Sequence, residues 1–169
     1  MKLSRIIAGA SAVVTSFGIT VGVASAEKVL TVASWAAPFH TMNENVFPWM
    51  NSQLRNCTDG SLGLKVEYGM APPPAMYDTV RDGVADLSWI VYGYTPGKFV
   101  TTMIAELPSI PGNARQKSVA FQKTYEKFFE SAGEAKGVQV LANYTHGPGM
   151  ANTIKKVTSY KELEGVKMR

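Results

Sequence analysis

The residues that could carry out catalysis or bind a metal are few and widely separated in this sequence. His40 and His146 are the two histidines, and neither has a His, Cys or carboxylate at metal-ligand spacing. No nucleophile elbow, phosphate-binding loop or dinucleotide fingerprint occurs. Asp82 and Asp86 are four residues apart, but Gly83 between them indicates a helix end, where capping or solvation explains them better than acid–base catalysis. We therefore predict a protein that is not an enzyme and that uses no cofactor and no metal.

A second group of side chains is better suited to binding than to catalysis. Most of them lie near the ends of predicted parallel strands, and ligands of open α/β sheets bind beyond the carboxyl ends of the strands. Local packing is the alternative role for each aromatic residue, and a hydrogen-bonded structural role is the alternative for each histidine. The candidate ligand-binding residues outside the C-terminal motif are Trp35, His40, Pro73, Trp89, Tyr92, Tyr94 and His146.

The elements that must position these residues alternate along the first half of the chain. Residues 29–33 are a short β-branched run, typical of a buried strand, and residues 62–68 alternate apolar and polar side chains with the period of a strand. Between them, apolar residues recur every four positions over residues 42–54, which predicts a helix. Residues 75–82 follow three prolines and predict a second helix, and residues 84–91 predict a third strand. This order predicts an α/β fold with a largely parallel sheet.

The second half continues the same pattern after a long loop. Residues 92–113 are rich in Gly and Pro, and loops of this length in compact domains are usually functional. Further strands are predicted at residues 138–142, 150–154 and 166–168. An amphipathic helix is predicted before them, with core-facing residues Phe121, Tyr125, Phe128, Phe129 and Ala132.

The N-terminal 26 residues have the composition of an export signal. A positive start is followed by an uncharged apolar stretch and by Ala24-Ser25-Ala26, the small-x-small pattern that a signal peptidase needs. We predict cleavage after Ala26 and a periplasmic mature protein that begins at Glu27. An uncut membrane anchor is the alternative.

Bulk composition excludes several other classes of protein. The chain has 169 residues and a formal net charge of +4, two charges of which lie in the export signal, so a nucleic-acid partner is not indicated. Cys57 is the only cysteine, which excludes an intrachain disulfide.

Several sequence stretches resemble one known family. GVADLSWIVYGYTPGKF at residues 83–99 and AELPSIPG at 105–112 are similar to the extracytoplasmic solute-binding proteins of TRAP transporters, the DctP type. PPPAMYDTVRDGVAD at residues 72–86 and THGPGMANTIKKVTSYKELEGVKMR at 145–169 resemble the same family. The last stretch ends in a motif of the form D/E-L-x-G-x-K-x-R.

The resemblance implies a periplasmic-binding-protein-like fold of type II, with two lobes that close on the ligand. Residues 27–144 would form an incomplete lobe I, and residues 145–169 would be the hinge crossover and the start of lobe II. Members of the family are about twice as long, so the chain is expected to be a fragment of a longer protein. The implied function is delivery of a small organic acid to the membrane permease subunits of a TRAP transporter.

The resemblance also implies how the acid is held. Arg169, the last residue of the motif, would bind the carboxylate, because a guanidinium makes two parallel hydrogen bonds to a carboxylate and keeps its charge when buried. Gly149 or a neighbour stands where some members have a second arginine, and Tyr94 stands where sialic-acid binders are polar or basic. A smaller or aromatic acid is therefore expected rather than a richly hydroxylated one. The alternatives are a membrane-tethered ligand-sensing module and a periplasmic enzyme on a similar scaffold.

Overall fold

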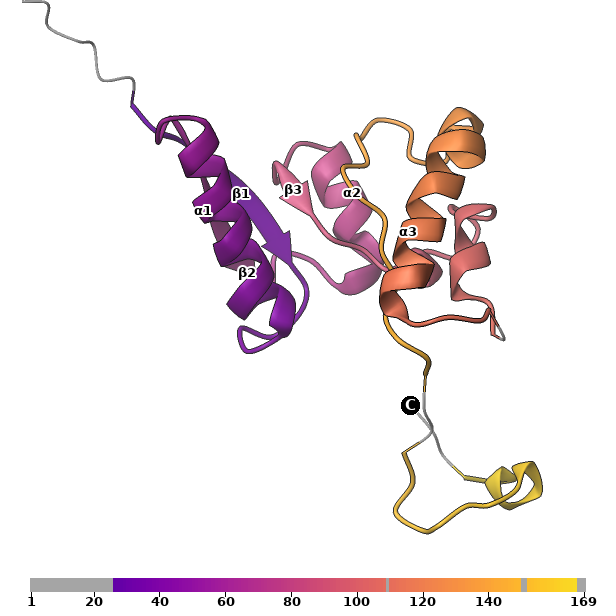
Figure 1. The fold of residues 1–169 in the computed structure, drawn as a ribbon. Helices are drawn as coiled ribbons and strands as arrows, with labels where there is room; N and C mark the ends of the chain where they lie inside the picture. The colour runs from indigo at the N-terminus through magenta and orange to yellow at the C-terminus, as the bar shows by residue number, and fades with distance from the viewer. Residues whose placement is uncertain (1–25, 109, 150–151, 167–169) are drawn as a thin grey trace, which may run out of the picture.

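The chain folds around a small parallel sheet in the computed structural model, which describes residues 26–108, 110–149 and 152–166. Residues 1–25 of the predicted export signal lie outside these ranges, and so does Arg169. Three strands, β1 (Lys28–Ser34), β2 (Leu62–Tyr68) and β3 (Leu87–Ser88), pair in the order β2-β1-β3, with both pairings parallel. Figure 1 shows α1 beside β1 and β2, and α2 and α3 on the other side of the molecule. The predicted α/β fold is confirmed.

The two strands with a clear sequence pattern form as predicted. β1 lies between its two partners, and its last three residues, Val32, Ala33 and Ser34, are fully buried. β2 aligns with β1 without interruption from Lys28 opposite Leu62 onward. The connecting helix α1 (Phe47–Cys57) begins after a π-helical turn at Met42–Val46, with Pro48 in its first turn, where a missing backbone N–H costs nothing.

The third strand is much shorter than predicted. Residues 84–91 were expected to form it, but only Leu87 and Ser88 pair with β1. After α2 (Met76–Arg81), Gly83 takes a positive φ of 73° and the N–H groups of Val84 and Ala85 donate back to Thr79 O, so the chain is still turning at these residues. The prediction of a strand over 84–91 is therefore wrong in length.

The long loop over residues 92–113 has short 3₁₀ turns at Tyr92–Tyr94 and Thr102–Glu106. Helix α3 (Ala114–Thr124) follows, and it begins with a reciprocal capping box between Asn113 and Gln116. The helix then continues as a wider π-helical turn at Tyr125–Phe129.

The aromatic face predicted for this helix is only partly buried. Phe121 and Tyr125 are buried as expected, whereas Phe128 is 57% exposed. A π-helical turn has more residues than an α-helical turn, so it rotates the following side chains away from the original face. The prediction that Phe128 packs on the core is therefore wrong.

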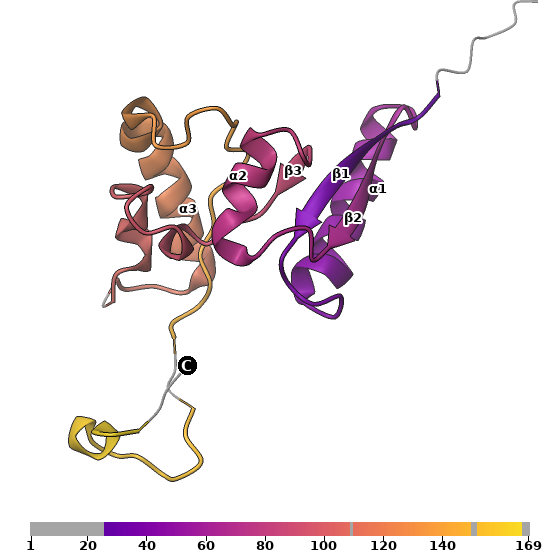
Figure 2. The ribbon, with the colours of Figure 1, turned by 180° about the vertical axis from the view of Figure 1, so that it is seen from behind.

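The predicted strand at residues 138–142 is absent. Residues 138–141 are in no strand, although they line a cavity of about 260 Å³ together with Leu87 and Ser88 of β3. Residues 152–154 and Val166 are not in strands either, and the rest of the two predicted C-terminal strands lies outside the described residues. The described residues 152–166 lie apart from the rest of the fold and contain one 3₁₀ turn at Tyr160–Leu163 (Figures 1 and 2).

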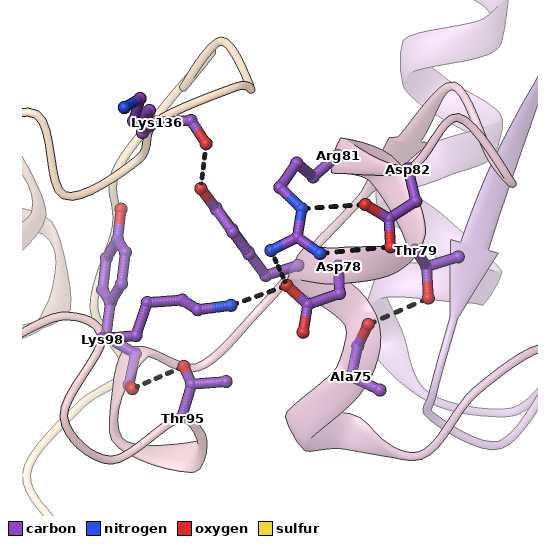
Figure 3. Close-up of polar contacts among 10 residues, drawn as sticks. Ala75, Asp78, Thr79, Arg81, Asp82, Thr95, Lys98 and Lys136 are labelled. Atoms are coloured by element: carbon purple, nitrogen blue, oxygen red, sulfur yellow. Dashed lines mark hydrogen bonds and ion pairs between the residues drawn. The ribbon is translucent and has the colours of Figure 1, made fainter.

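Charged residues of α2 join it to the loop that follows β3 (Figure 3). Lys98 Nζ lies 2.6 Å from Asp78 Oδ1 and 4.2 Å from the centre of the Tyr77 ring. Arg81 bridges Asp78, at 2.7 Å, and Asp82, at 2.8 Å. The Tyr77 hydroxyl donates to the backbone carbonyl of Lys136, which brings a third segment onto α2. Within the part of the chain that the structure describes, no helix is both long and apolar enough to cross a membrane.

Candidate functional site

A cavity of about 850 Å³ lies at the carboxyl ends of β1 and β3. The strand register places Ala33 opposite Ser88, so the residues that follow the two strands emerge side by side. Trp35 and Trp89 are these residues, and their rings stack with centres 4.3 Å apart and an interplanar angle of 30°. The parallel sheet thus builds a flat indole surface at the edge where ligands of α/β proteins bind.

A buried hydrogen-bond chain fixes this indole surface. Trp89 Nε1 donates to Ser34 Oγ at 3.1 Å, and Ser34 Oγ donates to Asn43 Oδ1 at 2.8 Å. The Asn43 amide donates in turn to the carbonyls of Ala36, at 3.2 Å, and Ala37, at 2.7 Å. The side chains of Ser34 and Asn43 together therefore connect the end of β1, the Trp89 ring and the loop that carries Trp35 and His40.

His40 and Tyr94 extend the aromatic wall around the two indoles. The centre of the His40 ring lies 5.1 Å from that of Trp89, and Tyr94 meets Trp35 edge-on at 5.6 Å. The turn that carries Tyr94 is held by Glu106, because Glu106 Oε1 accepts from Gly93 N at 2.9 Å. Edge-on and offset contacts of this kind are the arrangements that aromatic rings favour.

Tyr92 connects the aromatic wall to the opposite wall of the cavity. Its hydroxyl donates to Asn143 Oδ1 at 2.5 Å, and its ring packs edge-on against Phe99 at 4.8 Å. Burial raises the pKa of the Tyr92 phenol, so it remains a neutral hydrogen-bond donor at physiological pH. Gln122 Oε1 accepts from Asn143 N at 2.7 Å, which joins this network to α3.

The opposite wall consists of α3 and residues 143–149. Lys117 and Phe121 come from α3, and Thr145 and His146 come from the extended segment. Ser118 Oγ accepts from Thr145 N at 2.9 Å and so holds the two segments together. The cavity therefore has an aromatic wall on one side and a more polar wall on the other.

The structure brings together most, but not all, of the predicted site residues. Pro73 does not line the cavity: it begins the 3₁₀ turn Pro73–Ala75 ahead of α2, and it follows β2, which lies on the far side of β1 from β3. Arg169 lies outside the described residues. The sequence prediction did not include Lys117, Asn143 and Thr145, which no local motif distinguishes. The predicted residues that do line the cavity are Trp35, His40, Trp89, Tyr92, Tyr94 and His146.

No three His, Cys, Asp or Glu side chains in the described ranges lie close enough together to hold a metal ion. Hydrogen-bond donors and apolar rings dominate the lining, an arrangement suited to holding a small, partly apolar ligand.

Comparison with known proteins finds relatives that are transport or solute-binding proteins, although no protein-family model matches the chain. The outer membrane transporter protein TsaT of Comamonas testosteroni is 30% identical over 142 residues, which cover 82% of this chain and 42% of that protein. A TRAP periplasmic solute-binding protein from Bordetella bronchiseptica, solved with (R)- and (S)-mandelate, is 37% identical with a TM-score of 0.68. The match covers 73% of this chain and 40% of the other.

Two further solved TRAP solute-binding proteins carry benzoate-type ligands. One from a marine metagenome, in complex with 3-hydroxybenzoate, is 34% identical with a TM-score of 0.71 and is matched over 79% of this chain and 42% of its own. One from Rhodoferax ferrireducens, in complex with benzoate, is 28% identical with a TM-score of 0.65 over 72% and 38% of the two chains. The present chain thus spans about two fifths of the length of the relatives it matches. With the sequence motifs and the parallel α/β fold, these matches confirm the resemblance of the chain to the TRAP transporter solute-binding proteins.

Proposed function

We propose that this chain contributes to a periplasmic protein that captures a small aromatic carboxylate and delivers it to the membrane permease of a TRAP transporter. The observation that carries the proposal is the cavity of about 850 Å³ whose wall is the stacked pair Trp35 and Trp89. This volume lies within the range of small-molecule sites, about 300–1,000 Å³.

The chemistry of the aromatic wall favours a ring-bearing ligand. A ligand ring that stacks on an indole gains about 0.5–1.5 kcal/mol beyond its buried area, which an aliphatic acid does not gain. The solved relatives hold mandelate, 3-hydroxybenzoate and benzoate, which are aromatic acids of one ring. We propose a ligand of the same class for this chain.

The carboxylate of the ligand would be held by Arg169. Its guanidinium can make two parallel charged hydrogen bonds to a carboxylate, and an arginine keeps its charge in a closed site. Sequence beyond this chain, which spans about two fifths of its relatives, would supply the second lobe that closes the site. The signal at residues 1–26 would direct the protein to the periplasm.

Calorimetric titration of the mature protein, with any sequence that its gene adds after residue 169, tests this proposal. We expect benzoate and mandelate to bind, and malate, an aliphatic acid, to bind at least tenfold more weakly. Arg169→Ala and Arg169→Lys should each weaken benzoate binding by about 30-fold or more, because the buried carboxylate loses its paired hydrogen bonds. Tighter binding of malate than of both aromatic acids, or wild-type affinity in both Arg169 variants, would contradict the proposal.

A further inference from the structure

The polar wall of the cavity contains a lysine with no ion-pair partner. Lys117 lies in the first turns of α3, is partly buried and lines the cavity. None of the ion pairs among the described residues includes it. Glu106, the carboxylate that lines the same cavity, accepts instead from Gly93 N. The wall therefore offers a positive charge that no described carboxylate neutralises.

Thr145 adds a second donor on the same wall. Its Oγ1 is buried and has no hydrogen-bond partner among the described residues. An unpaired buried hydroxyl is unfavourable, and rotation about the Cα–Cβ bond can turn it toward the cavity. The hydrogen bond from Thr145 N to Ser118 Oγ, at 2.9 Å, fixes the backbone of Thr145 against the residue next to Lys117. The two side chains thus come from two segments that are hydrogen-bonded to each other.

We propose that Lys117 and Thr145 form a subsite for a second oxygen substituent of the ligand. An ammonium and a hydroxyl both donate, so the group that satisfies them is a hydrogen-bond acceptor, either a neutral hydroxyl oxygen or an anionic carboxylate. The inference rests on the proposed function, in which the ring lies on the aromatic wall and the first carboxylate is bound by Arg169. It narrows the proposed ligands to aromatic acids that carry a further oxygen group, which should bind more tightly than benzoate.

Titrations with three probes on one ring scaffold test the subsite. Benzoate, 3-hydroxybenzoate and benzene-1,3-dicarboxylate share the first carboxylate and differ only at the position that Lys117 and Thr145 would bind. We expect the wild-type protein to bind at least one substituted acid about tenfold or more tightly than benzoate. If only the dicarboxylate binds more tightly than benzoate, the subsite takes an anionic group. If both substituted acids bind more tightly, it takes an oxygen group that is either neutral or charged.

Variants of Lys117 separate this role from a structural one. Lys117→Met keeps most of the apolar stem, so it should weaken binding of the substituted acids at least about tenfold more than it weakens binding of benzoate. Lys117→Arg should retain much of the preference, and Lys123→Met, an exposed lysine of α3 that does not line the cavity, should have no effect. Thermal melts of all three variants establish that they fold.

Two results would overturn the subsite while leaving the proposed function intact. In one, benzoate binds and Lys117→Met weakens all three probes equally, which would assign Lys117 to the shared carboxylate. In the other, Lys117→Met changes the affinity of none of them. If the folded wild-type protein binds no aromatic acid, the proposed function itself fails and the subsite fails with it.

Discussion

The carboxylate of Glu134 joins the segment after α3 to a turn that borders the cavity. Glu134 Oε1 accepts from Thr101 N at 2.6 Å and from the Thr101 hydroxyl, and Oε2 accepts from Thr102 N at 3.0 Å and from the Thr102 hydroxyl. Burial alone would raise the pKa of Glu134, but these four hydrogen bonds favour the ionised form and lower its pKa to about 2. The turn they hold, Thr102–Glu106, carries the Glu106 side chain that lines the cavity.

We expect Glu134→Gln to lower the free energy of unfolding by about 1–2 kcal/mol at neutral pH. A drop in pKa from 4.5 to about 2 corresponds to about 3.4 kcal/mol, and solvent screening of this incompletely buried carboxylate reduces the net effect. Because the pKa is lower in the folded state than in the unfolded state, this stabilisation is fully present above about pH 4.5. It is lost as the pH falls toward 2.

Urea denaturation of the wild type and of Glu134→Gln at about pH 7, 5 and 3 measures this effect. The difference in unfolding free energy should be largest at pH 7 and should shrink by pH 3. Glu130→Gln is the matched control, since Glu130 is exposed and its side chain makes no hydrogen bond within the described ranges. A Glu134→Gln protein as stable as the wild type at pH 7, or a difference that does not change with pH, would refute the reasoning.

Three further predictions concern the binding site and the export of the protein to the periplasm. Trp89→Ala should weaken binding of an aromatic acid about tenfold by removing one indole of the stack, whereas Trp49→Ala, at a residue 63% exposed on α1, should leave calorimetric affinity unchanged. Asn43→Ala should lower the unfolding free energy by about 2–4 kcal/mol in urea titrations, because it removes two buried hydrogen bonds and one that is partly buried, and an unchanged value would count against the network. Mass spectrometry of the periplasmic fraction should find the protein cleaved after Ala26, and a membrane-bound product that retains the leader would contradict this.

Local sequence patterns correctly predicted those strands whose residue pattern follows from their place in the sheet. The strand over Leu62–Tyr68 has the predicted bounds, although its alternating apolar residues are half-buried or exposed rather than buried. The run from Val84 was misjudged because backbone bonds to Thr79 O, in the preceding helix, keep it turning. Residues 138–142 have a strand-like composition, but a strand needs a partner within hydrogen-bonding distance, and this segment pairs with none of the described strands.

The aromatic half of the site was predictable, whereas of the polar half the sequence predicted His146 but not Lys117 or Thr145. Trp35 and Trp89 follow adjacent parallel strands. Residues that follow such strands emerge at the same edge of the sheet, and this is enough to bring the two indoles together. Lys117 and Thr145 meet the cavity through a contact between Ser118 and Thr145, which are 27 residues apart in the sequence. No spacing rule connects a helix residue with an extended segment at that distance, so only the folded chain shows that they share a wall.

A crystal structure of the complete protein with 3-hydroxybenzoate tests the central claim most directly. The account predicts that the ligand ring lies against the indoles of Trp35 and Trp89, with its carboxylate at Arg169 and its hydroxyl oxygen toward Lys117. A ligand bound elsewhere on the protein, or one in this cavity whose ring does not contact either indole, would contradict it.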